Sequence, residues 1–451
     1  MQTPTDPTMF AEHRSRFLDA LGDDAALLFA PPEKLRNGDA EYRYRQSSDV
    51  LWLTGWTEPA CAILFRPGAE QPFIMFVQAK DPEREVWTGR RQGTQGAEEN
   101  FGADAAFPFK SLSEKLPDLL QGYENLHYQV AEDADRDVLV VKALKSARRK
   151  ARRNGLAVPS AFVDPERVLH ELRLFKSDAE LDLLREAASI TNDAMRRAMA
   201  VTAPDVNEYE LEAEIAHAFR RKGGTPGYTT IVGGGDNATV LHYVTNNDPL
   251  QAGDLVCVDA GCEHRGYTAD VTRTWPVNGR FTDAQREIYD AVLEAQLAAI
   301  ATAVPGATFM EVTDVAARSL TASMLRLGLL EGDPDDDELV DTLIDEEKHK
   351  RFYMHGIGHW LGLDVHDVGA YTADGKSRRL APGMVLTIEP GLYINPDDET
   401  VPEALRGVGI RIEDDVLITK DGNEVLTAMI PKGIEEVEAC IGHAAQSAAA
   451  R

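Results

Sequence analysis

The chain has 451 residues, of which 43% are hydrophobic, and its formal net charge at pH 7 is −28. This length allows two or three domains with full hydrophobic cores. The acidity argues against a surface made for nucleic acid or for anionic membranes, because both partners require a positive field.

Targeting signals and disulfides are not evident in the sequence. The opening residues, MQTPTD, lack the basic and apolar regions of a secretory signal. No apolar run approaches the roughly 18 residues that span a bilayer. The cysteines, Cys61, Cys257, Cys262 and Cys440, are spaced too irregularly for a disulfide framework or a zinc knuckle. We therefore expect a cytoplasmic protein without a membrane partner.

The first half of the chain mixes short apolar runs with helical stretches. We expect a helix at 10–21, strands at 25–30, 50–53, 60–65, 72–77 and 126–130, and a linker at 159–165. The basic segment 142–153 is interpreted as the solvated face of a helix, because the chain as a whole is acidic. Strands separated by helices predict a small α/β domain over residues 1–172.

The second half opens with a strong helix signal. Ser177 and Glu180 have the spacing of a capping box, so the domain boundary is placed near residue 173. Further helices are expected at 207–222, 283–304 and 308–328, and strands at 254–260, 267–276, 383–390 and 408–419. The acidic segment 331–348 lacks the spacing of a calcium loop and is expected to be a solvated surface segment.

Two aspartates form the first candidate site. Asp259 and Asp270 lie in apolar segments joined by a polar turn. A turn centred on His264 and Arg265 would place the two carboxylates opposite each other, about 4.5–5.5 Å apart at Cβ, where like charges repel. A divalent cation between them would relieve this repulsion. The alternative is a splayed turn with both acids in water, and these two residues alone do not decide between the two interpretations.

Further candidates follow in the sequence. Residues 355–369 contain His355, His359 and His366, but Gly356 and Gly358 disfavour a helix and the glutamate of a zincin motif is missing. We expect an irregular loop that runs into a strand. Glu389 and Glu413 each lie within or at the end of an apolar strand pattern, and either acid alone is typical of a strand end in water.

Taken together, these residues predict a metal centre. Four carboxylates, from Asp259, Asp270, Glu389 and Glu413, would balance two divalent cations, and His359 would add a neutral nitrogen. A water bridging two metals ionises near neutral pH and forms a hydrolytic site. This donor set favours Mn²⁺, with Co²⁺, Fe²⁺ and Zn²⁺ as alternatives.

The order Asp-Asp-His-Glu-Glu resembles the five metal ligands of the pita-bread metallopeptidases, a family that includes methionine aminopeptidase, prolidase and aminopeptidase P. Residues 224–233, 241–243 and 355–369 resemble the aminopeptidase P and prolidase branch. Residues 40–49, 53–59 and 84–91 resemble bacterial aminopeptidase P. The resemblance covers nearly the whole chain and implies an α/β fold, with a pita-bread catalytic domain over residues 173–445.

The resemblance also implies roles for individual residues. Asp259 would bind one metal, His359 and Glu389 the other, and Asp270 and Glu413 would bridge both. Glu389, His366 and His242 would be the catalytic residues, with Glu389 assisting proton transfer and His366 hydrogen-bonding the substrate, and Arg411 would steady Asp259. The implied substrate contacts are His242, His355, Tyr228, Tyr393 and Trp87, with Trp87 reaching a neighbouring subunit. Taken alone, His242 is typical of a core histidine, Arg411 of a surface ion pair and Trp87 of core packing.

The activity implied by the resemblance is that of an Xaa-Pro aminopeptidase, which releases the N-terminal residue from peptides with proline second. The alternatives are a prolidase, which cleaves only the dipeptide, and a non-catalytic binding protein on the same fold. The family also implies a homo-oligomer, a dimer or a tetramer. In such an oligomer the N-terminal domain would serve assembly and substrate access.

Overall fold

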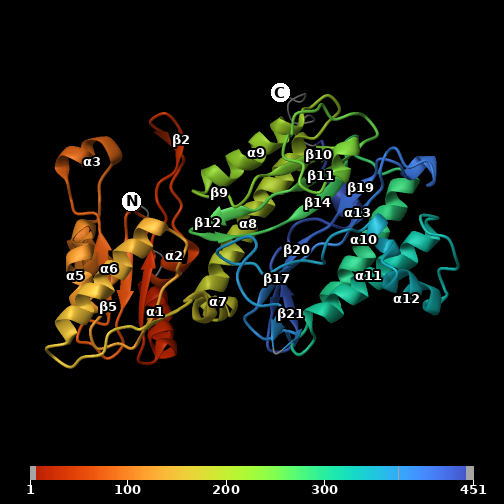
Figure 1. Cartoon of the computed structure of the whole chain (residues 1–451). Coiled ribbons are helices and arrows are strands. Elements are labelled where there is room, and N and C mark those ends of the chain that lie inside the picture. The colour runs from red at the N-terminus through yellow and green to blue at the C-terminus, as the bar shows by residue number, and fades with distance from the viewer. Residues whose placement is uncertain (1–6, 374, 443–451) are drawn as a thin grey trace. The chain divides into compact units, whose positions relative to one another are not determined.

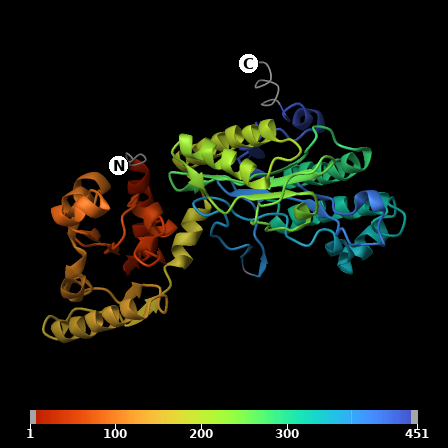
Figure 2. The same ribbon diagram turned by 90° about the horizontal axis from the view of Figure 1, so that it is seen from above.

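The computed structural model describes residues 7–373 and 375–442, and its contacts divide the chain into two units, Met1–Arg173 and Leu174–Arg451 (Figures 1 and 2). The opening segment 1–6 and the expected domain end at 445 lie outside the described residues. None of the helices in the described part is long and apolar enough to cross a membrane.

The first unit is built on a six-stranded mixed sheet with the strand order β6-β5-β4-β1-β7-β8. Its strands are β1 (Ala25–Phe29), β4 (Ala62–Phe65), β5 (Phe73–Val77), β6 (Ala105–Pro108), β7 (Asn125–His127) and β8 (Ala161–Val163). Its helices are α1 (Pro7–Leu21), α2 (Ser48–Thr54), α3 (Pro82–Thr88), α4 (Gly93–Phe101), α5 (Leu112–Leu119), α6 (Ala134–Ala151) and α7 (Glu166–Leu174). A small hairpin joins β2 (Leu35–Asn37) and β3 (Ala40–Glu41), and the 3-10 turn η1 (Phe109–Ser111) precedes α5.

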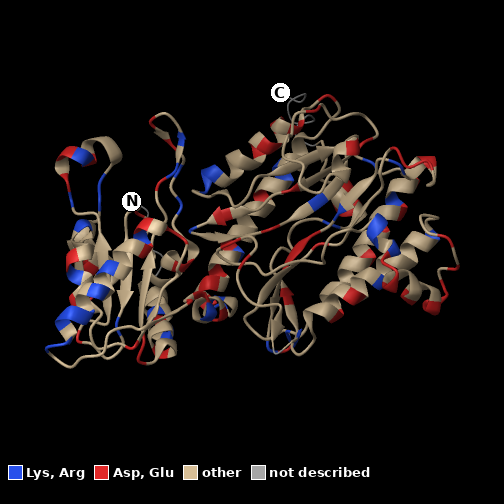
Figure 3. Ribbon diagram, viewed as in Figure 1, with Lys and Arg blue, Asp and Glu red and all other residues tan. Residues whose placement is uncertain are grey.

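Two predictions for this unit were wrong. The strand expected at 50–53 is helix α2, because Ser47 caps its first turn by accepting from the Val50 N–H and Gly55 ends it at φ 69°. The linker expected at 159–165 contains β8, which extends the sheet beside β7. The basic residues of α6 lie on an exposed face, as expected, and Figure 3 shows them gathered along that helix.

In the second unit, strands lie between two pairs of long helices (Figure 1). The helices are α8 (Asp178–Val201), α9 (Glu208–Arg221), α10 (Asp283–Thr302) and α11 (Phe309–Arg326). All four begin with a capping box, including the predicted one at Ser177 and Glu180. The larger of its apolar clusters joins α8 residues such as Met195 to the strand residue Val256 and to Leu320 of α11.

The strands of the second unit form several short ladders. They are β9 (Thr225–Pro226), β10 (Ile231–Gly234), β11 (Leu255–Asp259), β12 (Cys262–His264), β13 (Tyr267–Thr268), β14 (Thr272–Pro276), β15 (Thr372–Ala373), β16 (Lys376–Ser377), β17 (Val385–Ile388), β18 (Gly391–Tyr393), β19 (Gly409–Arg411), β20 (Asp414–Ile418) and β21 (Asn423–Val425). The ladders run β10-β11-β14, β13-β12-β9, β17-β20-β21, β18-β19 and β15-β16. Short helical segments complete the unit, namely η2 (Gly235–Thr239), α12 (Asp337–Asp345), η3 (Lys348–Arg351), η4 (Glu403–Leu405) and α13 (Ile434–Glu438).

The register predicted for the hairpin between the two aspartates was wrong. His264 pairs with Tyr267, so the turn consists of Arg265 and Gly266, with φ values of 52° and 92°. A two-residue turn with positive φ at both positions matches the twist of a hairpin, and glycine adopts that conformation without strain. As a consequence, Asp259 pairs with Thr272 rather than with Asp270.

Other segments also differ from expectation. The strands expected at 267–276 and 408–419 are each broken in two, into β13 and β14 and into β19 and β20. The acidic segment 331–348 contains helix α12, which Asp336 caps. The loop at 355–369 is irregular, as expected, but it makes only an isolated bridge at Trp360 and does not run into a strand before β15.

Candidate metal centre

Each predicted carboxylate ligand lies where a strand ends or breaks. Asp259 is the last residue of β11, and Glu389 directly follows β17. Asp270 lies between β13 and β14, and Glu413 lies between β19 and β20. Backbone groups in such breaks need other partners. The Asp270 N–H accordingly donates to the carboxylate of Asp415, and the Glu413 N–H donates to the Thr272 carbonyl.

His359 reaches these acids from the loop at 355–369. Its backbone N–H donates to Thr387 Oγ1 at 3.1 Å, which fixes the loop against β17. Its Nδ1 lies 3.1 Å from the Trp360 carbonyl, and its Nε2 lies 3.3 Å from Asp270 Oδ2 and 3.6 Å from Glu389 Oε1. A carbonyl that accepts from Nδ1–H leaves the lone pair on Nε2, which is the tautomer that binds metals.

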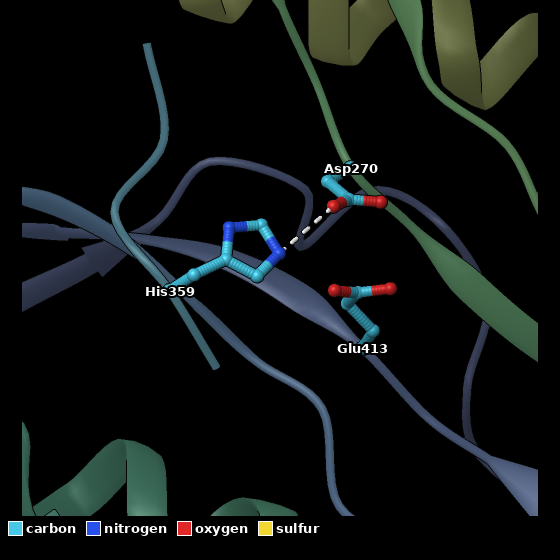
Figure 4. A group of neighbouring side chains, drawn as sticks. All are labelled: Asp270, His359 and Glu413. Carbon is cyan, nitrogen blue, oxygen red and sulfur yellow. Dashed lines mark ion pairs between the residues drawn. The ribbon is translucent and has the colours of Figure 1, made fainter. Parts of the chain in front are cut away.

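Three of the predicted ligands converge closely. Asp270, His359 and Glu413 each offer one atom within 4.8 Å of the others, and Figure 4 shows them facing a common space. Glu389 joins this group through its 3.6 Å approach to His359 Nε2.

Tyr228 links the fourth carboxylate, Asp259, to the group. Its hydroxyl lies 2.6 Å from Asp259 Oδ1 and 2.5 Å from Asp270 Oδ1. One hydroxyl donates one hydrogen bond, so a second carboxylate at this distance requires a proton or a cation nearby. Arg411 donates from Nη2 to Asp259 Oδ2 at 2.8 Å, consistent with its predicted partner. Tyr228, which was predicted to contact substrate, lines the cavity, and its hydroxyl contacts two of the predicted ligands.

The acids and the imidazole of the centre have shifted pKa values. Burial raises the pKa of Glu389 to about 7. Burial and the neighbouring acids Asp270 and Glu389 hold the pKa of Glu413 well above its usual range. Burial acts on His359 in the opposite sense, but its hydrogen bond to Asp270 and that carboxylate's charge raise the pKa of the imidazole to about 9. In the protein alone, the acids and the imidazole therefore compete for protons.

The donor set fits divalent cations. Four carboxylates carry four negative charges, which two divalent ions balance, and the imidazole adds a neutral donor. The residues that would hold the ions are Asp259, Asp270, His359, Glu389 and Glu413. Ligands of this kind lose their protons when a metal binds, so the raised pKa values are a consequence of the same crowding that favours the metal.

A cavity of about 610 Å³ opens onto this centre. Its lining includes the remaining predicted histidines, His242, His355 and His366, together with Tyr371. The ring of His366 lies 4.2 Å from that of His359, centroid to centroid. The lining also includes the apolar side chains Ile231, Leu241, Val244 and Val365, so the cavity can accept a non-polar group.

Of the predicted substrate contacts in the second unit, Tyr393 is absent from the described lining of this cavity. Tyr393 is 3% exposed, and its hydroxyl lies 2.9 Å from His355 Nε2 and accepts from Arg411. Tyr393 thus holds the side chains of His355 and Arg411, which line the cavity, by hydrogen bonds. Trp87 belongs to α3 in the first unit, where it is 88% exposed.

Sequence reasoning missed several residues that support the ligands. Thr272 donates to Glu413 Oε2 at 2.6 Å, Thr387 holds the backbone of His359, and Asp415 holds that of Asp270. The spacing Asp270-Val271-Thr272 places the threonine on the same face as the aspartate, which was an available signal. Asp415 offered no such signal, because its role depends on a strand break.

Comparison with known proteins identifies the class. Residues 182–420 match the model of metallopeptidase family M24, and residues 10–128 match that of the aminopeptidase P N-terminal domain. The chain is 48% identical to an Escherichia coli Xaa-Pro aminopeptidase, over 92% of this chain and 93% of that one. A Haemophilus influenzae Xaa-Pro aminopeptidase is 42% identical, over 95% and 96%.

Solved structures agree. The fold matches Pseudomonas aeruginosa aminopeptidase PepP with a TM-score of 0.94 at 42% identity, covering 99% of this chain and 100% of that one. It also matches a zinc-substituted E. coli aminopeptidase P in complex with product, with a TM-score of 0.91 at 45% identity, covering 99% of each chain.

The fold and the site are thus those of a metallopeptidase, and the chain belongs to metallopeptidase family M24. Within that family it has the two-part organisation of the Xaa-Pro aminopeptidases, and it is a metallo-aminopeptidase. The predicted α/β fold with a C-terminal pita-bread domain and the predicted resemblance to aminopeptidase P are confirmed.

Proposed function

We propose that this protein releases the N-terminal residue from peptides with proline in second position, using two divalent metal ions held by Asp259, Asp270, His359, Glu389 and Glu413. The observation that carries the proposal is the convergence of buried acids and one imidazole at the floor of the cavity. The Xaa-Pro aminopeptidases among its relatives support the substrate class.

When bound, the metal ions supply a Lewis acid and lower the pKa of a coordinated water. Glu389 lines the cavity beside the other predicted ligands, where its carboxylate would accept a proton from the attacking water and pass it to the departing proline nitrogen. His366 donates a hydrogen bond to the scissile carbonyl oxygen as negative charge develops there. Arg411 keeps the carboxylate of Asp259 in place.

The proline side of the substrate fits the apolar and imidazole walls. A peptide bond before proline has no N–H, so a protease that binds its substrate as a β-strand loses a hydrogen bond there. A site that acts on the carbonyl alone does not need that N–H. His242 and His355 line the cavity and would flank the pyrrolidine ring.

The experiment is hydrolysis of Ala-Pro, Ala-Pro-Ala and a longer peptide beginning Ala-Pro, with and without added Mn²⁺. We expect free alanine from the tripeptide and from the longer peptide, but no cleavage of a peptide with alanine second. Cleavage of the dipeptide alone would identify a prolidase, and no cleavage by the metal-loaded protein would favour a binding protein.

Three finer features belong to the same proposal. We propose Mn²⁺ as the physiological metal, because oxygen ligands outnumber nitrogen, with Co²⁺, Fe²⁺ or Zn²⁺ as alternatives. We also propose a cytoplasmic homo-oligomer, a dimer or a tetramer, with residues 1–172 serving assembly and access. The 88% exposure of Trp87 supports a contact with another subunit at that residue. Light scattering of the wild type and of Trp87→Ala measures the assembly.

A further inference from the structure

A buried ion pair lies outside the catalytic and metal-binding residues considered so far. Lys176 Nζ lies 3.0 Å from Asp367 Oδ2, and the two side chains are 1% and 2% exposed. The free energy needed to remove two charges from water offsets much of their attraction, and an apolar pair of similar size would often stabilise the fold as well. A buried ion pair is therefore weak evidence for a role in stability alone. Its position therefore points to another role.

The anion of this pair closes the loop that carries two of the site's histidines. The Asp367 N–H donates to the Trp360 carbonyl at 2.8 Å, so His359 and His366 flank the two ends of a closed loop. Their rings meet at 4.2 Å. Asp367 is 7% exposed, whereas the neighbouring His366 is exposed and lines the cavity.

The loop is built tightly over the ion pair. A Cβ added at Gly362 would lie 2.2 Å from Asp367 Oδ2 and 3.0 Å from Lys176 Cε. The Gly362 carbonyl also accepts from the Thr268 N–H at 2.9 Å. Any larger side chain at this position would displace the carboxylate of Asp367.

The cation is held by rigid neighbours. Lys176 directly precedes Ser177, the N-cap residue of α8, whose capping box with Glu180 fixes the start of that helix. The Lys176 N–H donates to the Gly383 carbonyl at 2.9 Å. The ammonium group is therefore a fixed point from which Asp367 is held.

We propose that Asp367, anchored by Lys176, is a positioning residue that sets the direction of the His366 imidazole toward the substrate carbonyl. This inference rests on the proposed peptidase function, in which His366 contacts substrate. An ion pair with hydrogen-bonding geometry fixes direction as well as distance, which an apolar pair does not. Small errors in the position of a catalytic group lower turnover strongly.

The test is a double-mutant cycle between Asp367→Asn and His366→Ala, measured as kcat and KM on Ala-Pro-Ala with Mn²⁺. We expect Asp367→Asn alone to lower kcat by about tenfold or more, with KM and bound metal little changed. In the His366→Ala background the same substitution should lower kcat no further, because it acts through that imidazole. Equal effects in both backgrounds would overturn the proposal.

A second variant covers the case in which Asp367→Asn does not fold. Lys176→Met combined with Asp367→Leu removes both charges, so the melting temperature should stay close to that of the wild type while kcat stays low. Recovery of kcat together with stability would mean that the pair only stabilises the fold, and loss of bound metal would mean that it positions His359 instead.

A matched control separates these effects from general destabilisation. Glu438→Gln also breaks a buried carboxylate's ion pairs, with Arg280 and Arg286, none of which lines the cavity. It should lower the melting temperature and leave kcat unchanged. A wild type inactive on every Xaa-Pro peptide would refute the proposed function itself, whereas an active wild type with an additive cycle refutes only the positioning role.

Discussion

At the scale of single residues, the centre brings several acidic side chains together in a buried place, where their charged forms are unfavourable. Asp270 and Glu413 are 4% and 1% exposed, and burial raises the pKa of both carboxyls. Acids in this situation destabilise the protein alone and stabilise its metal complex. Function is here obtained at the expense of stability, which is typical of active sites.

Asp270→Asn tests this balance. Removing one charge relieves repulsion among the acids, so the melting temperature of the metal-free variant should rise above that of the metal-free wild type. The increase produced by Mn²⁺ should be largely lost, and activity should be abolished because both ions lose a ligand. Differential scanning calorimetry with and without Mn²⁺ measures both effects. Unchanged metal-induced stabilisation would contradict the assignment of Asp270 as a ligand.

His366→Ala should behave in a different way. The imidazole lines the cavity and is not among the proposed ligands, so the variant should keep its metal while kcat falls by about a hundredfold, the typical contribution of one such donor. Metal analysis together with steady-state kinetics separates the two outcomes. Loss of metal in proportion to activity would place His366 among the ligands.

The acids and the histidine that gather at this centre could be picked out from the sequence, because acids and histidines beside apolar strands are conspicuous, and their role as metal ligands stays a prediction. Not all of their supporting residues could be predicted in the same way. The spacing of Asp270 and Thr272 was a signal for the support that Thr272 gives to Glu413, whereas Asp415 supports Asp270 only because two strands break next to each other. The hydroxyl of Tyr228 likewise lies between Asp259 and Asp270 only because the fold brings together residues that are 31 and 42 positions apart in the sequence.

At the scale of elements, the hairpin between β12 and β13 sets the register of the strands β11 and β14, beside which Asp259 and Asp270 lie. Its turn residues Arg265 and Gly266 both have positive φ, and the pairing that follows puts Asp259 opposite Thr272. The predicted register was wrong because the turn was centred on the polar pair rather than on the glycine. Two-residue turns select the residues that tolerate positive φ.

Substitutions in this turn should change stability in opposite directions. Arg265→Asn should stabilise the protein by about 0.5 kcal/mol, because asparagine adopts φ 52° more readily than arginine. Gly266→Ala should destabilise it by about 1 kcal/mol, because φ is 92° there. Urea unfolding monitored by fluorescence measures both changes. Equal stability of the two variants would contradict the turn geometry.

Long elements were predicted more reliably than short ones. The helices that begin with capping boxes were expected close to their observed bounds, because the caps and the apolar periodicity agree. Residues 50–53, in contrast, are apolar enough for a buried strand, and only the caps at Ser47 and Gly55 make them a helix. The break between β19 and β20 was not predicted, because apolar residues flank the acids at 413–415 on both sides and the whole stretch was assigned to one strand.

At the scale of the whole molecule, the C-terminal segment is tied to the catalytic unit by ion pairs. Glu438 of α13 accepts from Arg280, Arg286 and the Phe281 N–H. Burial alone would raise the pKa of this carboxyl, but these donors lower it below its ordinary value. A carboxyl with a lowered pKa stabilises the folded state above its unfolded pKa, and this contribution is lost as the pH falls through the folded value.

The difference in melting temperature between the wild type and Glu438→Gln should therefore be largest near neutral pH and decrease as the pH falls. At pH 7 the variant should melt roughly 2–4 °C lower. Below the ordinary glutamate pKa of 4.5 the difference in melting temperature should narrow, because the wild-type carboxyl then becomes protonated and is uncharged, like the glutamine of the variant. Thermal scans from pH 7 to pH 4 measure it. A difference that stays constant over this range would show that the pairing does not depend on ionisation.

The account as a whole depends on two cations being held by five side chains, Asp259, Asp270, His359, Glu389 and Glu413. The most direct test is equilibrium dialysis against Mn²⁺ with metal analysis of the wild type and of Asp270→Ala, alongside hydrolysis of Ala-Pro-Ala by the same samples. We predict two bound ions per chain and release of alanine for the wild type, with loss of both in the variant. A metal-free wild type that hydrolyses the peptide, or a variant that still binds two ions, would contradict the account.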